Sequence, residues 1–185
     1  MAEVHSDDVT RRDFLYIATG AFTAVGAGFA AWPLVDQMNP AANVLAVSTT
    51  EVDLTPVEEG QIITVMWQGK PVFVRHRTPK EIDEAKAVDV SDLRDSGAEN
   101  DNLKDAKALA TDDNRTMKPE WLIVTGICTH LGCVPLGHQG DFDGWFCPCH
   151  GSHYDTAGRI RKGPAPKNLH IPVYKFTTDT SVLIG

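Results

Sequence analysis

The distribution of apolar and polar positions divides the chain into two parts of different character. From Phe14 to Val35 the sequence carries no formal charge and is rich in Ala, Gly, Phe and Leu. A helix of this length rises about 1.5 Å per residue and spans roughly 33 Å, enough to cross a hydrocarbon core of about 30 Å. The run is apolar on every face, whereas a helix packed on a soluble core is apolar along one stripe. It therefore predicts a membrane anchor over residues 14–35, with a buried core helix as the alternative.

Two adjacent arginines precede this apolar run. Arg11 and Arg12, followed by an apolar segment, resemble a twin-arginine export signal, although the lysine often found after that motif is absent. Positive charge before an anchor also holds that end in the cytoplasm, so simple positive-inside anchoring is a second explanation. The end of the run, from Trp32 to Val35, is bulky and offers no small-residue cleavage site. We expect residues 1–13 to form a cytoplasmic N-terminus and the anchor to stay uncleaved.

Residues 36–48 separate the anchor from the rest of the chain. They include Pro40, which discourages a continuous helix, and the stretch 41–43 offers little to bury. We expect a flexible tether over residues 36–48 and a folded head domain over residues 49–185.

Beyond the tether the pattern changes to short alternating or β-branched runs, which are typical of strands. Strands are predicted over residues 44–54, 61–67, 71–77, 121–127, 171–176 and 181–184. Gln68-Gly69-Lys70 predicts a hairpin turn, and Thr78-Pro79 predicts a helix start with the proline near the first helical position. The predicted fold class is mainly β: an antiparallel head with a partly helical insertion, preceded by one transmembrane helix.

Charge adds two points to this picture. The net charge of −8 over 185 residues argues against nucleic acid as a partner, because its phosphates would be repelled. Much of the excess lies between Glu81 and Asp113, where eleven acidic residues stand against four basic ones. We expect this acidic stretch to be a solvated surface insertion, and we also expect Arg159 to Lys162 to be a solvated segment.

Two short cysteine–histidine boxes carry the candidate chemistry. They are Cys128-Thr129-His130-Leu131-Gly132-Cys133 and Cys147-Pro148-Cys149-His150-Gly151-Ser152. Together they contain all four cysteines and supply two thiols and two imidazoles in the order C-x-H-x16-C-x2-H, with a cysteine pair left over. Such a set can hold one metal centre.

The spacing within the boxes excludes several cysteine chemistries. Covalent haem attachment requires C-x-x-C-H and a thioredoxin-like dithiol requires C-x-x-C, and neither pattern is present. A disulfide framework of all four cysteines would leave both histidines unexplained. A zinc site is chemically possible, although zinc fingers usually place two cysteines together and then two histidines. A zinc-binding module without a redox role is therefore an alternative.

The boxes resemble those of Rieske proteins, which carry a [2Fe–2S] cluster with two cysteines on one iron and two histidines on the other. The resemblance implies that Cys128 and Cys147 bind one iron, and that His130 and His150 bind the other. Replacing two thiolates by neutral imidazoles leaves the cluster less negative, which places Rieske potentials in a range of roughly −150 to +300 mV.

Matches beyond the ligands extend the resemblance. Ser152 and Tyr154 stand where the family places hydroxyl donors, Ser152 to a bridging sulfide and Tyr154 to the Cys128 sulfur; such bonds raise the potential. Residues 163–166, Gly-Pro-Ala-Pro, resemble the proline loop that covers the cluster. The implied surroundings of the cluster are Ser152, Tyr154, Leu131, Gly132 and Pro164.

The two remaining cysteines sharpen the resemblance. The family implies a disulfide between Cys133 and Cys149 that joins the two ligand loops. Soluble Rieske ferredoxins and oxygenase domains generally lack this pair, whereas membrane-bound Rieske subunits of cytochrome bc complexes have it, in a compartment where a disulfide persists. With its anchor, the chain resembles the iron–sulfur subunits of bacterial cytochrome bc1 complexes, the quinol–cytochrome c oxidoreductases.

This resemblance implies a function. The subunit would take one electron, coupled to a proton, from ubiquinol at cytochrome b and pass it to cytochrome c1. His150 and His130 would be the catalytic ligands, with His150 hydrogen-bonded to ubiquinol and Leu131 at an apolar docking tip. The parent complex would be dimeric, in the bacterial inner membrane with the head on the periplasmic side, and the tether would let the head swing. The alternatives are a Rieske subunit of another oxidoreductase, such as arsenite oxidase or a b6f complex, or an oxygenase-type ferredoxin.

Overall fold

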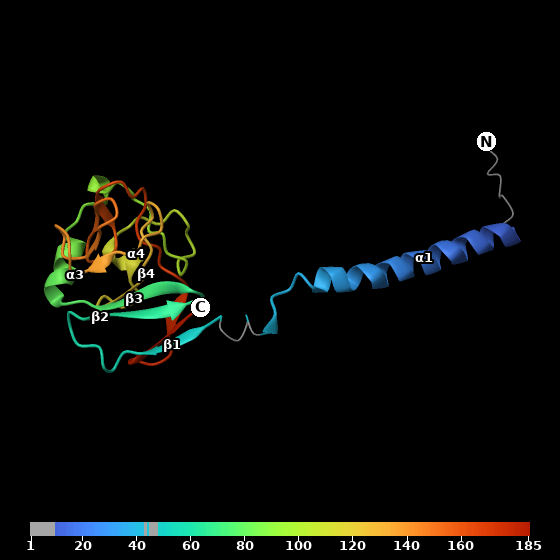
Figure 1. The fold of residues 1–185 in the computed structure, drawn as a ribbon, viewed down its shortest axis with the longest axis horizontal. Coiled ribbons are helices and arrows are strands. Elements are labelled where there is room, and N and C mark those ends of the chain that lie inside the picture. The colour runs from blue at the N-terminus through green and yellow to red at the C-terminus, as the bar shows by residue number, and fades with distance from the viewer. Residues whose placement is uncertain (1–9, 43, 45–47) are drawn as a thin grey trace, which may run out of the picture. The chain divides into compact units, whose positions relative to one another are not determined.

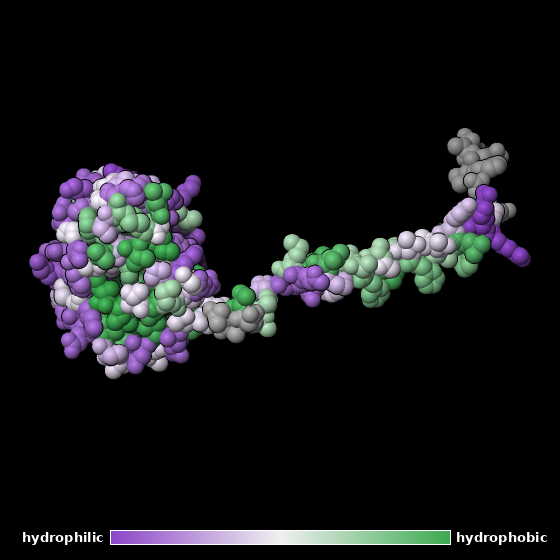
Figure 2. Space-filling model, in the orientation of Figure 1, coloured by the Kyte–Doolittle hydropathy of each residue, from purple (hydrophilic) through white to green (hydrophobic). Residues whose placement is uncertain are grey.

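The computed structural model describes residues 10–42, 44 and 48–185, and the chain divides into two compact units, Met1–Leu45 and Ala46–Gly185 (Figure 1). The surface of the first unit is largely apolar along its helix, whereas the surface of the second unit mixes hydrophilic and apolar residues (Figure 2).

The first unit contains one long helix, α1 (Arg11–Asp36). Its start is fixed by a capping box: the Thr10 side chain accepts a hydrogen bond from the backbone N–H of Asp13, and the Asp13 carboxylate accepts one from the N–H of Thr10. None of its residues is buried within the chain, and it is long and apolar enough to cross a membrane. The helix therefore includes the apolar run together with the twin arginines before it.

The predicted tether begins where this helix ends. After Asp36 the backbone N–H groups of Met38 and Asn39 bond to carbonyls only three residues back, so the helical ladder closes before Pro40. Residues 43 and 45–47 lie outside the described residues, and the tether over residues 36–48 stays a prediction.

The head is built from three antiparallel sheets; the alternating runs predict the strands of the first two, whereas the third, formed around the second box, was not predicted. The first has the order β1 (Thr50–Asp53), β10 (Ser181–Ile184), β9 (Tyr174–Phe176); the second β2 (Ile62–Trp67), β3 (Lys70–His76), β4 (Trp121–Thr125); the third β5 (Leu136–Gly137), β6 (Trp145–Cys147), β7 (Ser152–Tyr154), β8 (Ile160–Lys162). Helical elements are α3 (Pro79–Lys86), the 3₁₀ turn η1 (Val90–Asp92) and α4 (Asp112–Arg115). Every residue of β4 is buried, so the strand that leads into the first box lies in the core.

Two local predictions can be checked in detail. The β2–β3 turn is shorter than expected: Gln68 and Gly69 both have positive φ, and Trp67 already pairs with Lys70. Positive φ at two central residues is the type I′ pattern, whose twist matches that of the strands. The helix start is confirmed, because Thr78 caps α3 in a reciprocal pair with Glu81.

The acidic stretch is largely exposed, as its composition predicts, but acidic residues near its two ends are not solvated. Asp112 is 3% exposed and accepts a bidentate pair of hydrogen bonds from Arg77 at 2.6 and 3.0 Å. Glu81 pairs with the buried Arg75 at 2.5 Å. Buried carboxylates need such partners, because an unpaired buried charge is strongly destabilising. The acidic residues at both ends of the stretch thus tie it to the head.

The segment Arg159–Lys162 also differs from expectation. Arg159 is fully buried, with its Nε 2.8 Å from a carboxylate oxygen of Asp155, and Ile160 is buried beside it in β8. Arg161 is partly buried and Lys162 is exposed, so these two residues are the solvated part. The prediction of a solvated segment was wrong for Arg159 because it relied on charge alone. A guanidinium can be buried when carboxylate and carbonyl oxygens accept its hydrogen bonds.

Candidate metal centre

The two boxes form loops with the same backbone turn. In the first, which follows β4, the N–H of Gly132 donates to the Cys128 carbonyl at 3.0 Å; in the second, which joins β6 to β7, Gly151 donates to Cys147 at 3.0 Å. Both glycines have positive φ, +82° and +75°, a conformation that L side chains rarely adopt. Each glycine therefore reverses the chain within two residues of the histidine of its box.

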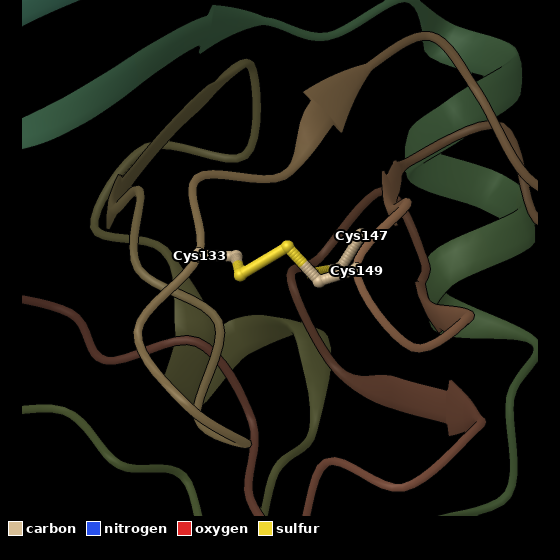
Figure 3. Close-up of side chains that lie close together, drawn as sticks. All are labelled: Cys133, Cys147 and Cys149. Atoms are coloured by element: carbon tan, nitrogen blue, oxygen red, sulfur yellow. A yellow bond between two sulfur atoms is a disulfide. The ribbon is translucent and has the colours of Figure 1, made fainter.

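A disulfide joins the two loops. It links Cys133 to Cys149, the pair that the resemblance predicts (Figure 3). The sulfurs of Cys133, Cys147 and Cys149 lie within 4.8 Å of one another, but two of the three are consumed by the disulfide. Cys128 and Cys147 remain as free thiols, and both residues are only 2% exposed. Two buried thiols, one from each loop, are thus left to bind a metal.

The two histidines of the boxes lie against each other. The rings of His130 and His150 lie edge to face, with centroids 4.5 Å apart. The Nδ1 atom of His130 is buried and has no hydrogen-bond partner within the described part of the chain. A buried polar atom without a partner is costly, so this nitrogen fits a metal ligand better than a packed side chain. His150 is exposed at the surface.

The environment of Cys147 fits a thiolate bound to metal. Burial raises the pKa of its thiol, while backbone N–H groups of Cys149 and His150 act in the opposite direction. A buried thiol with a raised pKa loses its proton when a metal binds, because the metal takes the thiolate. Two buried sulfurs and two imidazoles are a donor set suited to iron–sulfur ligation as well as to zinc.

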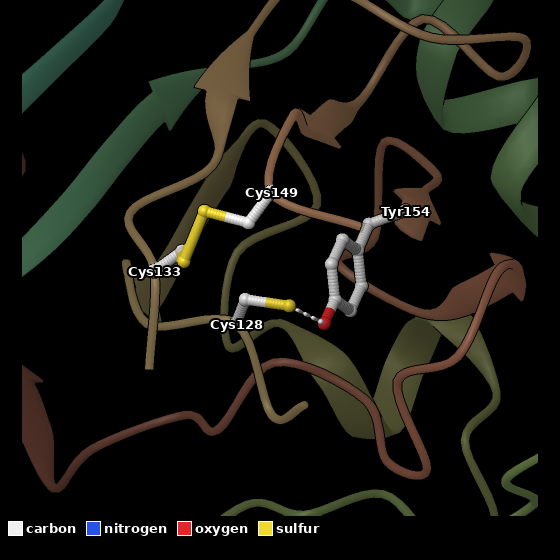
Figure 4. Close-up of a disulfide and its surroundings, with 4 residues drawn as sticks. All are labelled: Cys128, Cys133, Cys149 and Tyr154. Carbon is white, nitrogen blue, oxygen red and sulfur yellow. Dashed lines mark hydrogen bonds between the residues drawn. A yellow bond between two sulfur atoms is a disulfide. The ribbon is translucent and has the colours of Figure 1, made fainter. Parts of the chain in front are cut away.

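Tyr154 crosses from one loop to the other. Its hydroxyl donates a hydrogen bond to the Cys128 sulfur at 3.3 Å (Figure 4) and accepts one from the backbone N–H of Thr129, also at 3.3 Å. Burial, followed by the hydrogen bond to Cys128, raises the pKa of this phenol. Tyr154 therefore keeps its proton and remains a donor to the sulfur at all ordinary pH values.

The other predicted residues fall around this arrangement. Ser152 is 1% exposed, and its Oγ accepts a hydrogen bond from the backbone N–H of Ala165 at 3.1 Å. Leu131 is 71% exposed, and Pro164 is exposed in the following loop. The structure thus places Leu131 at the surface, next in sequence to His130, as a docking tip requires.

Sequence reasoning missed three residues that hold the site together. Thr129 donates through its Oγ1 to the carbonyl of Lys167 at 2.7 Å. In the same loop Asn168 bonds to Asp95, and Arg94 donates to the carbonyl of Ala165. Thr129 could have been suspected from its place between Cys128 and His130. Nothing in the sequence marks the other two, whose partners are some 70 positions away along the chain.

Comparison with known proteins decides between the possible metal centres. The family model for the Rieske [2Fe-2S] domain matches residues 53–175. The chain belongs to the Rieske family. A second model, described as the Ubiquitinol-cytochrome C reductase Fe-S subunit TAT signal, matches residues 1–41. Membership of the Rieske family means that the metal centre is one [2Fe–2S] cluster and not zinc.

Relatives and solved structures agree with this assignment. A ubiquinol-cytochrome c reductase iron-sulfur subunit from Rhodospirillum rubrum is 56% identical over 189 residues, covering 100% of this chain and 96% of that protein. The subunit of the same name from Rhodobacter capsulatus is 53% identical, with 100% of both chains covered. Among solved structures, a chain of a hyperthermophilic respiratory complex III is 27% identical with a TM-score of 0.51, covering 90% of this Rieske protein and 98% of that chain.

Proposed function

We propose that this Rieske protein takes one electron, together with a proton, from ubiquinol at a cytochrome b subunit and passes the electron to cytochrome c1. The observation that carries the proposal is its similarity, over the full length, to ubiquinol-cytochrome c reductase iron-sulfur subunits. The chain is therefore a subunit of a quinol–cytochrome c oxidoreductase, and the activity belongs to the assembled complex.

The residues that would hold the cluster are those brought together by the two loops. Cys128 and Cys147 would bind one iron and His130 and His150 the other. This is supported by the two buried free thiols and by the buried, unpartnered Nδ1 of His130. When bound, the cluster supplies reversible one-electron chemistry at a potential that its histidine ligands raise.

His150 is the residue that would form a hydrogen bond with the quinol. An imidazole that binds metal through one nitrogen leaves the other free to exchange a proton. His150 is exposed, while His130 turns one nitrogen inward, so both can present their second nitrogen towards the surface. The exposed Leu131 beside them would supply an apolar contact for ubiquinol or for the cytochrome b surface.

The proposed location follows from the anchor. Helix α1 would span the bacterial inner membrane once, with the twin arginines in the cytoplasm and the head on the periplasmic side. A match to a TAT-signal model supports export of the head in folded form. The parent complex is expected to be dimeric, as the resemblance to bc1 complexes implies.

The ligand assignment is tested by redox titration of the full chain in its native membrane, followed by EPR at several pH values. We expect a [2Fe–2S] signal with a positive potential that falls as pH rises, because oxidation acidifies the free imidazole nitrogens. His150→Asn should abolish this signal. His138→Asn is the matched control, since His138 has φ +57°, a conformation that Asn tolerates, and lies outside the proposed ligand set.

Two results would contradict the proposal. A signal that survives in His150→Asn would remove this residue from the ligand set. A potential that does not change with pH around neutrality would remove the proton coupling and favour an oxygenase-type carrier.

The location is tested separately by the double variant Arg11→Lys with Arg12→Lys. This variant should leave the head in the cytoplasm, and a head still found outside would argue for simple positive-inside anchoring.

A further inference from the structure

A short strap from the acidic stretch lies along the loop that follows β8. We call residues 94–99 the strap and residues 163–168 the proline loop. The guanidinium Nη1 of Arg94 donates to the carbonyl of Ala165 at 3.2 Å and also to the carbonyl of Gly163. These two carbonyls flank Pro164, so one side chain holds the loop on both sides of its first proline.

The rest of the strap fixes the far end of the same loop. The backbone N–H of Asn168 donates to the Asp95 carboxylate at 2.8 Å, and the Asn168 side-chain amide donates to the carbonyls of Asp95 and Gly97. Lys167 pairs with Glu99 at 2.8 Å. Asn168 and Asp95 are wholly or partly buried, so these bonds are less exposed to water than a surface ion pair.

The proline loop touches both ligand loops on its inner side. Lys167 exchanges hydrogen bonds with the Thr129 hydroxyl of the first box. The backbone at Gly163 approaches the second box so closely that an added Cβ would lie 2.2 Å from the Gly151 carbonyl oxygen. The N–H of Ala165 donates to Ser152 Oγ at 3.1 Å. The loop is therefore held between the strap and the two boxes.

The hydrogen bond from Ala165 to Ser152 would connect the strap, through the proline loop, to the metal centre. Among the described residues it is the one hydrogen bond of the buried Ser152 hydroxyl, and in it the oxygen is the acceptor. The hydroxyl's own hydrogen is left to donate. The direction of that hydrogen depends on where the Ala165 N–H lies, and Arg94 fixes the carbonyl of the same residue.

We infer that Arg94 is a positioning residue that sets the reduction potential of the cluster, acting through the proline loop and the Ser152 hydroxyl. The inference rests on the proposed ligand set: Ser152 is buried and follows the proposed ligand His150 by two residues, which would put its hydroxyl beside the cluster. A hydroxyl that donates a hydrogen bond to a cluster sulfur stabilises the more negative, reduced state. The reduction potential therefore falls when this hydrogen bond is lost. Arg94 itself touches neither a thiol nor an imidazole of the boxes.

The test compares potentials in the full chain in its native membrane, by redox titration with EPR detection. Arg94→Gln should lower the equilibrium constant for reduction about fivefold, which for a one-electron couple is about 41 mV, since tenfold is about 59 mV. Arg94→Lys keeps three donors on a similar reach and should restore most of the potential. Lys104→Gln is the matched control, because it removes the same charge from an exposed residue whose side chain makes no hydrogen bond or ion pair among the described residues.

A double-mutant cycle with Ser152→Ala tests the route. If Arg94 acts through Ser152, adding Arg94→Gln to Ser152→Ala should change the equilibrium constant for reduction by less than twofold, because coupled residues are not additive. Additive shifts would overturn the route, and equal potentials for Arg94→Gln and Lys104→Gln would overturn the inference itself. If Arg94→Gln fails to assemble a cluster, Arg94→Met, which also removes every donor of the side chain, takes its place in the same cycle, and a potential equal to that of Lys104→Gln rejects the inference. A wild-type chain without a [2Fe–2S] signal would reject the proposed function instead.

Discussion

The Tyr154 hydroxyl donates a hydrogen bond of 3.3 Å to the sulfur of Cys128, and this bond crosses from the second box to the first. Tyr154 ends strand β7, which leaves the second box, whereas Cys128 opens the first. The disulfide between Cys133 and Cys149 crosses between the same two loops. The sulfur environment on one loop is thus set by residues that the other loop delivers.

Removal of the Tyr154 hydroxyl should lower the reduction potential. A hydrogen bond to the Cys128 sulfur stabilises the reduced state, and its net worth is about 1 kcal/mol. Tyr154→Phe should therefore lower the potential by roughly 40 mV for a one-electron couple, measured by redox titration with EPR detection. Tyr174→Phe is the control, because the Tyr174 hydroxyl accepts a bond from Met117 N–H and lies outside the boxes. An unchanged potential in Tyr154→Phe would show that this bond does not tune the centre.

Addition of a methyl group at Gly163 should separate the proline loop from the second box. Its Cβ would lie 2.2 Å from the Gly151 carbonyl oxygen and 2.5 Å from the Ser152 Cα, and backbone atoms cannot yield as a flexible side chain does. Gly69→Ala is matched, since Gly69 also has positive φ but has no atom within 4 Å of the added carbon. Gly163→Ala should lower the free energy of unfolding by about 2 kcal/mol or more, and Gly69→Ala by about 1 kcal/mol. Similar denaturation midpoints for the two variants would disprove the close approach.

Loss of the disulfide should reduce stability without removing a proposed ligand. Cys133 and Cys149 are separated by 16 positions, and closing a loop of this size is worth about 3 kcal/mol in the chain-entropy model. Cys133→Ala with Cys149→Ala should lower the temperature at which the visible absorbance of the cluster disappears. The double variant is used because a single one leaves a reactive thiol beside Cys147. A wild-type temperature would mean that the loops are held without the disulfide.

The ion pair between Arg77 and Asp112 should be much stronger than a surface pair. Both side chains are almost fully buried, so Asp112→Asn leaves a buried guanidinium without its counter-charge and should cost about 3–5 kcal/mol. Glu84→Gln removes the exposed partner of Lys80 and should cost less than about 0.5 kcal/mol. Both variants change one carboxylate to an amide, so urea midpoints compare them directly. Equal midpoints would show that the pair between Arg77 and Asp112 contributes no more than a surface pair.

Patterns that are local in the sequence were sufficient for much of the fold. The uniform apolar run is helix α1, the alternating runs are strands, and the Thr78 capping box starts α3 where the sequence places it. Each depends on residues within a few positions of one another, because helices and hairpins are stabilised by local bonds. The two boxes could also be recognised from the sequence, because the proposed metal ligands and the turning glycine of each box lie within six residues.

Contacts between distant segments were decided only by the tertiary structure. The sequence by itself determined the anchor, the β head and the set of cysteines and histidines that can hold a cluster. It could not show that Arg94 holds Ala165, that Asp112 neutralises Arg77, or that Arg159 is buried. The physical reason is that charge is a property of one residue, whereas burial and pairing depend on what the folded chain brings beside it.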